Sequence, residues 1–239
     1  MTLRRPVKIA GSVAAFLAIL LAGMLVSPRV LRAQHDNDDD NDNNESKIQI
    51  GFRIAPVKLN MAGKVRDLVG LGSYIVNAQA DCAGCHSAGP PTEFTASGNP
   101  YLLRPVFRGK KAFNPATYLG GGNDFGAFPA EGPFPHIVSR NLTPDKTGLL
   151  EGGATFQEFL TIMRTGKDFD HLHPTCTGAP NGNCLPPPFN GDLLQIMPWV
   201  VYQDMTDHDI RAIYEYLSAI PCIAGPPAPS HLHHECSNR

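Results

Sequence analysis

The sequence lacks several features that would place it in a common functional class. Only one Cys-x-x-Cys pair is present, so the second ligand pair of a typical structural zinc site is missing. The triple-glycine run at 120–122 has no Lys-Ser/Thr pair after it and no flanking strand-helix pattern, which excludes a phosphate-binding loop. The acidic stretch 35–46 lacks the spaced glycine and terminal glutamate of a calcium-binding EF-hand.

Basic residues are scarce beyond the first 33 residues. The chain has 20 Lys and Arg against 22 Asp and Glu, a formal net charge of −2. Residues 1–33 hold five of the basic residues and no acidic ones, which leaves 15 basic against 22 acidic residues and a net charge of −7. Nucleic acid is therefore not an expected partner.

Residues 1–33 are typical of an export signal. Three basic residues precede an apolar run at 9–26, and Ala33 offers a small residue at a cleavage site before Gln34. We expect cleavage there and a periplasmic or other extracytoplasmic location. If the segment is retained, its run of about 18 residues is long enough for an N-terminal membrane anchor, which is the only membrane attachment expected.

The central motif is Cys82-Ala83-Gly84-Cys85-His86. Two cysteines at this spacing can form thioethers to the vinyl groups of a haem, and the histidine after them then lies under the iron. A redox dithiol is the alternative, but it does not need the adjacent histidine. Because the motif occurs once, we expect one covalent haem c, with Cys82, Cys85 and His86 as haem-binding residues.

The second ring nitrogen of the iron-ligating histidine is expected to donate a hydrogen bond to a backbone carbonyl. Carbonyls near Gly89 or Pro90 are the candidates, because they follow the motif directly.

The four remaining cysteines are Cys176, Cys184, Cys222 and Cys236. An even number of cysteines in an oxidising compartment predicts two disulfides, for which three pairings exist. We favour the local pairing, Cys176–Cys184 and Cys222–Cys236. The first bond would close a loop rich in Pro, Gly and Asn, and the second would tie down the C-terminal tail.

Apolar residues at helical spacing predict a helix over 64–80 that leads into the motif. Gly70 and Gly72 either weaken this helix or allow another element to pack closely against it. The preceding residues 48–60 are expected to be an extended lead-in, which Pro56 interrupts.

Two further helices carry clear start and stop signals. Thr155 and Glu158 have the spacing of a capping box, and Gly166 suits the end of that helix. A last helix is predicted to start at Thr206, with acidic residues in its first turn, and to stop before Pro221.

Four segments follow from these signals. We expect a signal peptide at 1–33, an acidic disordered spacer and extended lead-in at 34–63, a haem domain at 64–221, and a tethered C-terminal tail at 222–239. Within the domain, residues 89–135 are rich in Gly, Pro and Asn, which predicts long ordered loops.

The sixth iron ligand would decide between an electron carrier and a catalyst or gas binder. Met197 precedes a proline in a loop before the last helix, and that proline would stiffen a loop able to present sulfur to iron. Met163 lies on the apolar stripe of a helix, where core filling is the more frequent role. His171 and His173 compete as ligands from a loop.

Other polar residues have weaker assignments. Arg104, Arg108 and Arg140 are candidates to pair with haem propionates, although a solvated surface position is an equal alternative for each.

The tail histidines resemble a transition-metal cluster together with Cys236. These histidines are His231, His233 and His234.

A series of segments resembles class I monohaem cytochromes c in content and order. The segments are Tyr74 to Ala78 leading into the haem motif, Asn-Leu-Thr-Pro-Asp-Lys-Thr-Gly at 141–148, residues 156–166, Met197-Pro198, and residues 206–221. In particular, the sequence resembles the cytochrome c subunit domains of membrane-bound alcohol, gluconate and sorbitol dehydrogenases.

The resemblance implies a mostly α, cytochrome c-like helical domain around one covalent haem, with long Gly/Pro-rich loops. It also implies that the first and last helices cross, that His86 and Met197 are the axial ligands, and that the activity is electron transfer. The dehydrogenase subunits resemble a string of three such domains with a C-terminal membrane helix, whereas we expect one domain here. An insertion at 176–188 also departs from the pattern.

We therefore expect a periplasmic electron carrier, not an enzyme. It would pass single electrons between a dehydrogenase-type donor and a respiratory acceptor, with a dehydrogenase, an oxidase or another cytochrome as partner. Two alternatives remain. One is a haem enzyme or gas-binding protein with an exchangeable sixth ligand, and the other is a metal-binding module formed by the His-rich tail.

Overall fold

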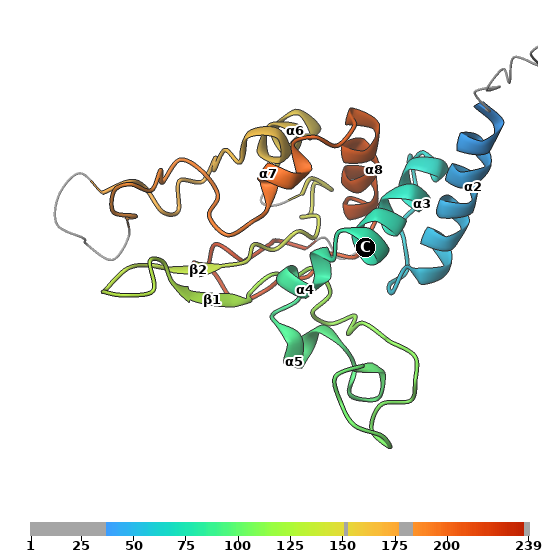
Figure 1. The fold of residues 1–239 in the computed structure, drawn as a ribbon, viewed down its shortest axis with the longest axis horizontal. Coiled ribbons are helices and arrows are strands. Elements are labelled where there is room, and N and C mark those ends of the chain that lie inside the picture. Colours follow the sequence, from blue (N-terminus) through green and yellow to red (C-terminus); the bar gives the residue numbers. More distant parts are fainter. Residues whose placement is uncertain (1–36, 151–152, 177–183, 237–239) are drawn as a thin grey trace, which may run out of the picture. The chain divides into compact units, whose positions relative to one another are not determined.

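The computed structural model describes residues 37–150, 153–176 and 184–236, with side chains from residue 46 onward except at position 90. The chain divides into two units, 1–41 and 42–239, and all features below lie in the second unit apart from the start of the first helix. The elements (Figure 1) are α2 (Asn37–Ile54), α3 (Arg66–Tyr74), a π-helical turn (Ile75–Gln79), α4 (Cys82–His86), α5 (Pro90–Glu93), a 3-10 turn (Ala96–Gly98), β1 (Asp124–Ala127), β2 (His136–Val138), α6 (Phe156–Thr165), α7 (Trp199–Tyr202) and α8 (Asp207–Leu217).

Helix α2 lies where the sequence predicts a disordered spacer followed by an extended lead-in. It continues to Ile54, so the expected extended conformation is wrong for residues 48–54. Ile48 and Phe52, one helical turn apart, lie directly against Gly70 of α3, and the Ser73 hydroxyl donates to the Gly51 carbonyl at 2.7 Å. Packing against α3 thus makes this segment helical.

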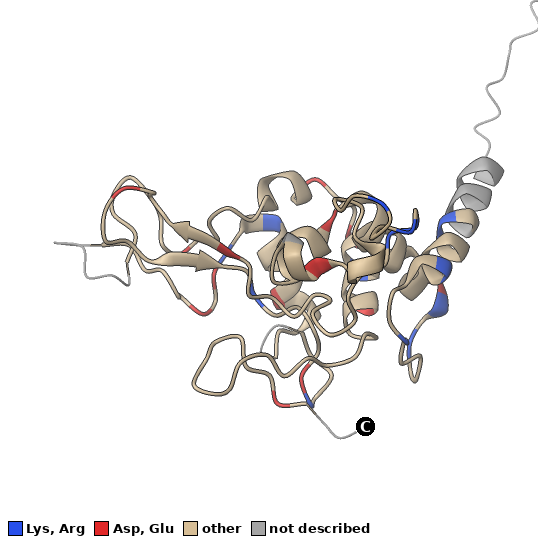
Figure 2. Cartoon of the chain, turned by 90° about the horizontal axis from the view of Figure 1, so that it is seen from below, with Lys and Arg blue, Asp and Glu red and all other residues tan. Residues whose placement is uncertain are grey.

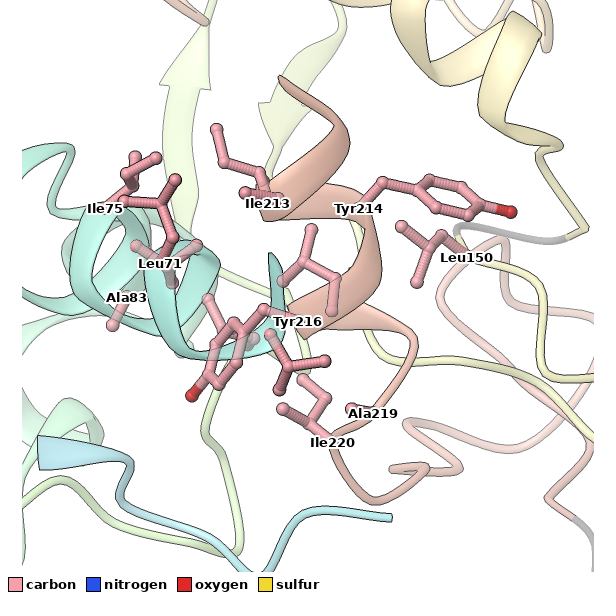
Figure 3. Packing of buried hydrophobic residues seen from close by; sticks show 14 of the residues in the cluster. Leu71, Ile75, Ala83, Leu150, Ile213, Tyr214, Tyr216, Ala219 and Ile220 are labelled. Carbon is pink, nitrogen blue, oxygen red and sulfur yellow. The ribbon is translucent and has the colours of Figure 1, made fainter. Parts of the chain in front are cut away.

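Helices α3 and α8 pack against each other at the centre of the core (Figure 3). At Gly72 the α3 backbone lies so close to α8 that a Cβ there would collide with the Ala212 carbonyl and the Tyr216 Cβ. The sequence left two alternatives for Gly72, a weakened helix or close packing by another element. The structure shows close packing, which the missing side chain of Gly72 permits. The expected helix before the motif is present as α3 and a π-helical turn.

A buried polar network crosses the same core. The Tyr118 hydroxyl donates to Asn77 Oδ1 at 2.6 Å and lies 2.8 Å from the Tyr216 hydroxyl. Asn77 Nδ2 donates to the Ser73 carbonyl at 2.9 Å. The network joins α8, the end of α3 and the loop that contains Tyr118, so it holds that loop beside the motif.

Both later helices have the predicted caps. The Thr155 hydroxyl accepts from the Glu158 N–H, the Glu158 carboxylate accepts from the Thr155 N–H, and Gly166 ends α6 with φ 68°. Thr206 caps α8 by accepting from the Asp209 N–H. These local signals specify both helix starts.

The remaining structure is a small antiparallel sheet and long loops. Strands β1 and β2 pair with Asp124 opposite Val138 and Ala127 opposite His136. Among the helices of the described residues, none has the length and apolar character needed to cross a membrane.

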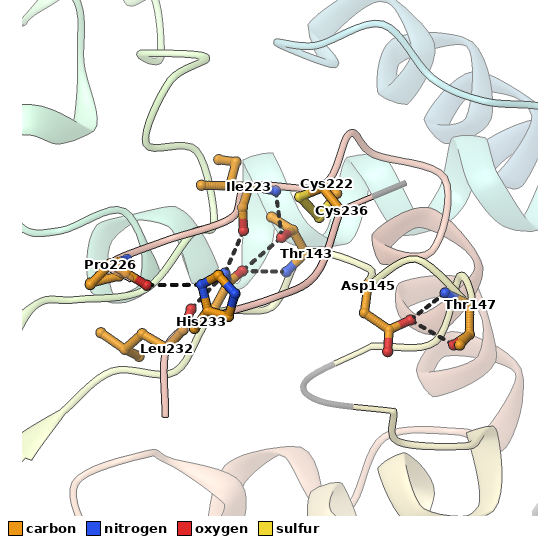
Figure 4. Close-up of a disulfide and its surroundings, with 10 residues drawn as sticks. Thr143, Asp145, Thr147, Cys222, Ile223, Pro226, Leu232, His233 and Cys236 are labelled. Atoms are coloured by element: carbon orange, nitrogen blue, oxygen red, sulfur yellow. Dashed lines mark hydrogen bonds between the residues drawn. A yellow bond between two sulfur atoms is a disulfide. The ribbon is translucent and has the colours of Figure 1, made fainter. Parts of the chain in front are cut away.

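Both disulfides have the favoured pairing, Cys176–Cys184 and Cys222–Cys236. The second bond lies in the C-terminal tail, beside the segment that contains Thr143 (Figure 4). The tail is also held by hydrogen bonds, because Asn141 Nδ2 donates to the Ile223 carbonyl at 2.8 Å, and the Thr143 hydroxyl accepts from the Ile223 N–H at 3.0 Å. The Asn-x-Thr part of the 141–148 segment thus anchors the tail.

Candidate functional site

The structure brings the four main predicted residues to one cavity. Cys82 and Cys85 on α4, His86 at the end of α4, and Met197 in the loop before α7 all line a cavity of about 300 Å³. Most of the remaining wall is apolar, and it comes from β2 and the loop after it, from α6 and α8, and from the loops that contain residues 168–173 and 193–198. The apolar residues include Ile137, Leu142, Phe159, Ile162, Ile213 and Leu217.

Neither motif cysteine is in a disulfide. Cys82 is half-buried and Cys85 is exposed. Burial, with Asp81 and Cys85 nearby, raises the pKa of Cys82 to about 12, and burial also raises the pKa of Cys85. Both groups are therefore thiols at neutral pH. A reactive redox dithiol needs a lowered pKa at its attacking cysteine, so the raised pKa values of both cysteines disfavour that alternative.

His86 is held by a backbone contact from a distant part of the chain. Its Nδ1 lies 2.8 Å from the Arg140 carbonyl, which can only accept, so Nδ1 carries the hydrogen and Nε2 keeps its lone pair. The predicted partners near Gly89 and Pro90 are wrong. Burial lowers the pKa of His86, so the ring is neutral at pH 7, the form that a metal requires.

The triple-glycine run explains how the Arg140 carbonyl reaches the histidine. The Gly121 N–H donates to the His86 carbonyl at 2.7 Å, and the Gly122 N–H donates to the Ser139 carbonyl at 2.8 Å. Gly121 has φ +72° and no room for a Cβ beside the Arg140 backbone. The run thus allows three backbone segments to meet beside the motif, a role that its composition alone did not indicate.

Met197 lies in a loop with one strained residue. Ile196, immediately before it, has φ 67°, which is an outlier for a β-branched residue. Strain of this kind persists only where surrounding contacts enforce it, and it often occurs at functional positions. The Trp199 indole Nε1 donates to the Leu194 carbonyl at 3.1 Å and ties α7 to the same loop.

Two further residues that could bind iron lie on the same cavity. Met163 of α6 is 3% exposed and belongs to the hydrophobic core, as its helical position predicted, and it also lines the cavity. His173 also lines it, and its buried Nδ1 has no hydrogen-bond partner among the described residues. Its rival His171 is exposed and lies 3.3 Å from the Asp192 carboxylate. The cavity wall therefore holds three residues besides His86 that could bind iron: Met197, Met163 and His173.

One of the three predicted propionate partners lies at the cavity. Arg140 lines it, and its guanidinium contacts Asp168 at 2.5 Å and Asp170 at 2.7 Å. A propionate there would share the guanidinium with these carboxylates. Arg104 and Arg108 are exposed and are not part of the cavity wall.

Two residues of the suggested tail cluster, His233 and Cys236, are engaged in other contacts. His233 Nδ1 donates to the Pro226 carbonyl at 3.0 Å, and Cys236 is in the second disulfide. His234 is 4% exposed, and its Nδ1 has no partner among the described residues. No group of three or more metal-binding side chains is placed to hold an ion in the part of the chain that the structure describes.

The cavity fits the group that the motif implies. A flat, largely apolar macrocycle suits an apolar cavity that also has a thiol pair and a neutral imidazole on its wall. The residues that would hold a haem are Cys82 and Cys85, through their sulfurs, and His86, through Nε2.

The chain is similar to a known cytochrome subunit. It is 26% identical over 165 residues to the fructose dehydrogenase cytochrome subunit of Gluconobacter japonicus, a match that covers 69% of this chain and 24% of that protein. The chain thus spans about a quarter of that relative's length. No protein-family model matches the chain, and no solved structure matches it.

Proposed function

We propose that this chain is an exported monohaem cytochrome c that transfers single electrons. The observation that carries the proposal is the meeting of Cys82, Cys85, His86 and Met197 on one apolar cavity, although they span 116 positions of the sequence. The similarity to a dehydrogenase cytochrome subunit supports the same class. We also propose that the helices form a cytochrome c-like domain in which α3 and α8 are the crossing first and last helices.

Each cavity residue has a defined role in this proposal. A bound haem would supply the iron centre that accepts and releases one electron. Cys82 and Cys85 hold the group covalently, and the Arg140 carbonyl keeps the His86 ring in one tautomer and orientation. Met197 provides a thioether, which favours ferrous iron, and the apolar walls exclude water.

The proposal extends to the redox partners of the protein. We propose a dehydrogenase-type donor and a respiratory acceptor in an extracytoplasmic compartment. The two disulfides are consistent with an oxidising location. A purified dehydrogenase should reduce the protein directly, and stopped-flow absorbance at the haem bands would measure the rate.

Optical and EPR spectra of the purified holoprotein test the carrier proposal. The wild type is expected to be low-spin with a sulfur-to-iron charge-transfer band in the ferric state. Met197→Ala should lose that band, because the thioether is removed, while Met163→Ala and His173→Ala should keep it. These two variants are matched controls, since both residues line the same cavity.

Other outcomes reject parts of the proposal. A high-spin wild type that binds cyanide or carbon monoxide rapidly would favour an enzyme or gas-binding protein. Loss of the low-spin spectrum in Met163→Ala or His173→Ala, but not in Met197→Ala, would assign the ligand to that residue. Haem that is released from the denatured wild-type chain by acidic acetone would contradict covalent attachment at Cys82 and Cys85.

A further inference from the structure

A loop outside the cavity wall has an unusual group of exposed apolar side chains. We call residues 99–111 the Tyr101 loop. Of the ten large hydrophobic residues that are exposed in the described structure, four are in this loop: Tyr101 at 75%, Leu102 at 40%, Leu103 at 86% and Val106 at 47%. None of the four lines the cavity.

These exposed side chains belong to a loop that is held in place by ring contacts and hydrogen bonds. At its base the rings of Phe94 and Phe113 stack at 5.1 Å, and Phe94 also meets the Tyr101 ring edge-on at 6.1 Å. The Arg108 N–H donates to the Ser97 carbonyl at 2.9 Å. Figure 1 shows the chain leaving α5 and returning as a projecting loop.

The turn at the tip is also hydrogen-bonded. The Leu102 N–H donates to the Asn99 carbonyl at 3.2 Å, and the Val106 N–H donates to the Leu103 carbonyl at 3.0 Å. Asn99 Oδ1 accepts from the Tyr101 N–H at 3.0 Å. These contacts hold Leu103 out in solvent, where its apolar surface is unfavourable unless something covers it.

The same loop is strongly basic. It holds Arg104, Arg108, Lys110 and Lys111, and no acidic residue lies between Glu93 and Asp124 in the sequence. No carboxylate of the described residues pairs with Arg104, Arg108 or Lys110. Lys111 is partly engaged, because its Nζ donates to the Asn77 carbonyl at 3.3 Å. Figure 2 marks the basic and acidic positions along the ribbon.

We propose that the Tyr101 loop docks on an anionic lipid surface. Tyr101, Leu102 and Leu103 enter the interfacial layer, and Arg104 and Arg108 pair with lipid phosphates from its edge. This combination of an apolar tip, an aromatic ring and long basic side chains suits the boundary between headgroups and acyl chains. Each basic residue near such a surface adds to the attraction.

Charge distribution favours lipid and sets the orientation. The net charge is −2 for the whole chain and −7 without residues 1–33, so an anionic membrane does not attract the molecule as a whole. The positive charge of the Tyr101 loop therefore determines which face of the molecule approaches the membrane. A protein partner would need a concave pocket for consecutive protruding apolar residues, whereas a bilayer accommodates a convex loop of any outline. This interaction is independent of the proposed haem chemistry.

Hydrogen-exchange mass spectrometry of the full chain tests the docking. Exchange is measured in buffer, with phosphatidylcholine vesicles, and with vesicles that also contain phosphatidylglycerol. Exchange at 99–111 should slow several-fold only with the phosphatidylglycerol vesicles, and high salt should reverse the effect. Because each segment is measured separately, any binding by residues 1–33 does not obscure the result.

Variants separate the loop from other exposed apolar residues. Leu103→Asp and the double variant Arg104→Gln/Arg108→Gln should each abolish the protection. Val201→Asp is the matched control, because Val201 is 66% exposed on α7, and it should leave the protection unchanged. Thermal melting checks that all variants are folded.

Three outcomes would overturn the proposal. The first is unchanged exchange of the loop on both kinds of vesicle, and the second is equal protection on phosphatidylcholine alone. The third is protection of the loop only in complex with an acidic redox protein, which would make it a protein-docking loop.

Discussion

Burial decides the protonation state of several histidines, and a hydrogen bond decides the tautomer of one of them. The Arg140 carbonyl selects the tautomer of His86, while His173 and His234 each have a buried Nδ1 with no partner in the described structure. Burial lowers the pKa of all three rings and of His231. These histidines are therefore neutral in the folded protein at pH 7.

Stability should fall as the pH falls below neutral. For a histidine with a lowered folded-state pKa, the unfolded chain binds a proton first, near pH 6.5, and the folded chain binds it only at lower pH. The free energy of unfolding thus decreases as the pH falls through the unfolded-chain value of about 6.5, and it stops decreasing only below the lowered folded-state pKa. His234→Gln should flatten this dependence, as measured by thermal melting at a series of pH values.

The control for this experiment is His208→Gln, since His208 lies exposed at the start of α8. It should keep the wild-type pH dependence. If His234→Gln has the same slope as the wild type, the burial of His234 does not contribute to the acid sensitivity.

At the scale of elements, the α3–α8 contact links one wall of the cavity to the cysteine motif. Ile213 and Leu217 of α8 line the cavity, and α3 is followed by the π-helical turn and then, after Ala80 and Asp81, by α4. Any change in the separation of the two helices therefore moves one cavity wall relative to the motif cysteines. At Gly72 the two helices lie too close for a Cβ to fit between them.

Gly72→Ala should destabilise the protein although alanine favours helix formation. Its Cβ would collide with the Ala212 carbonyl and the Tyr216 Cβ, so the helices must shift. We expect a loss of about 1–3 kcal/mol in the free energy of unfolding, measured by denaturant titration. Gln157→Ala, on the exposed face of α6, is the control and should change stability little. An unchanged midpoint for Gly72→Ala would contradict the close helix packing.

At the scale of the whole molecule, the C-terminal tail supports the segment that orients the motif histidine. Asn141 and Thr143 are 1% and 0% exposed and bind Ile223 of the tail, and Asn141 directly follows Arg140. The triple-glycine run contacts residues 139–141 from another direction. The tail, the loop after β2 and the motif thus form one connected structure.

Removing the tail disulfide should loosen this structure. Cys222→Ser/Cys236→Ser opens a closed loop with a sequence separation of 14. The chain-entropy account predicts a loss of about 3 kcal/mol, measured by denaturant titration. Hydrogen exchange should also accelerate at 139–143, because the tail contacts of Asn141 and Thr143 become transient.

The matched control is Cys176→Ser/Cys184→Ser, which removes the other disulfide. It should also lower stability but should leave exchange at 139–143 unchanged. Equal acceleration there in both variants would show that the tail has no specific role in holding the segment.

The sequence by itself determined the features that depend on neighbours a few positions away. Thr155 and Glu158 cap α6 from three residues apart, Thr206 caps α8, and Cys176–Cys184 closes a short local loop. The interactions that specify these features lie within a few residues of one another. The Cys-x-x-Cys-His motif is local in the same sense, and it predicts the haem site without any knowledge of its surroundings.

Only the tertiary structure decided which distant groups meet at the cavity. The partner of His86 is the Arg140 carbonyl, 54 positions away, and not a carbonyl near Gly89. Helix α2 is helical to Ile54 because it packs on Gly70, and His173 joins the two methionines at the cavity through the path of its loop. A backbone carbonyl is present at every residue, so the sequence does not mark the one that packing brings into reach.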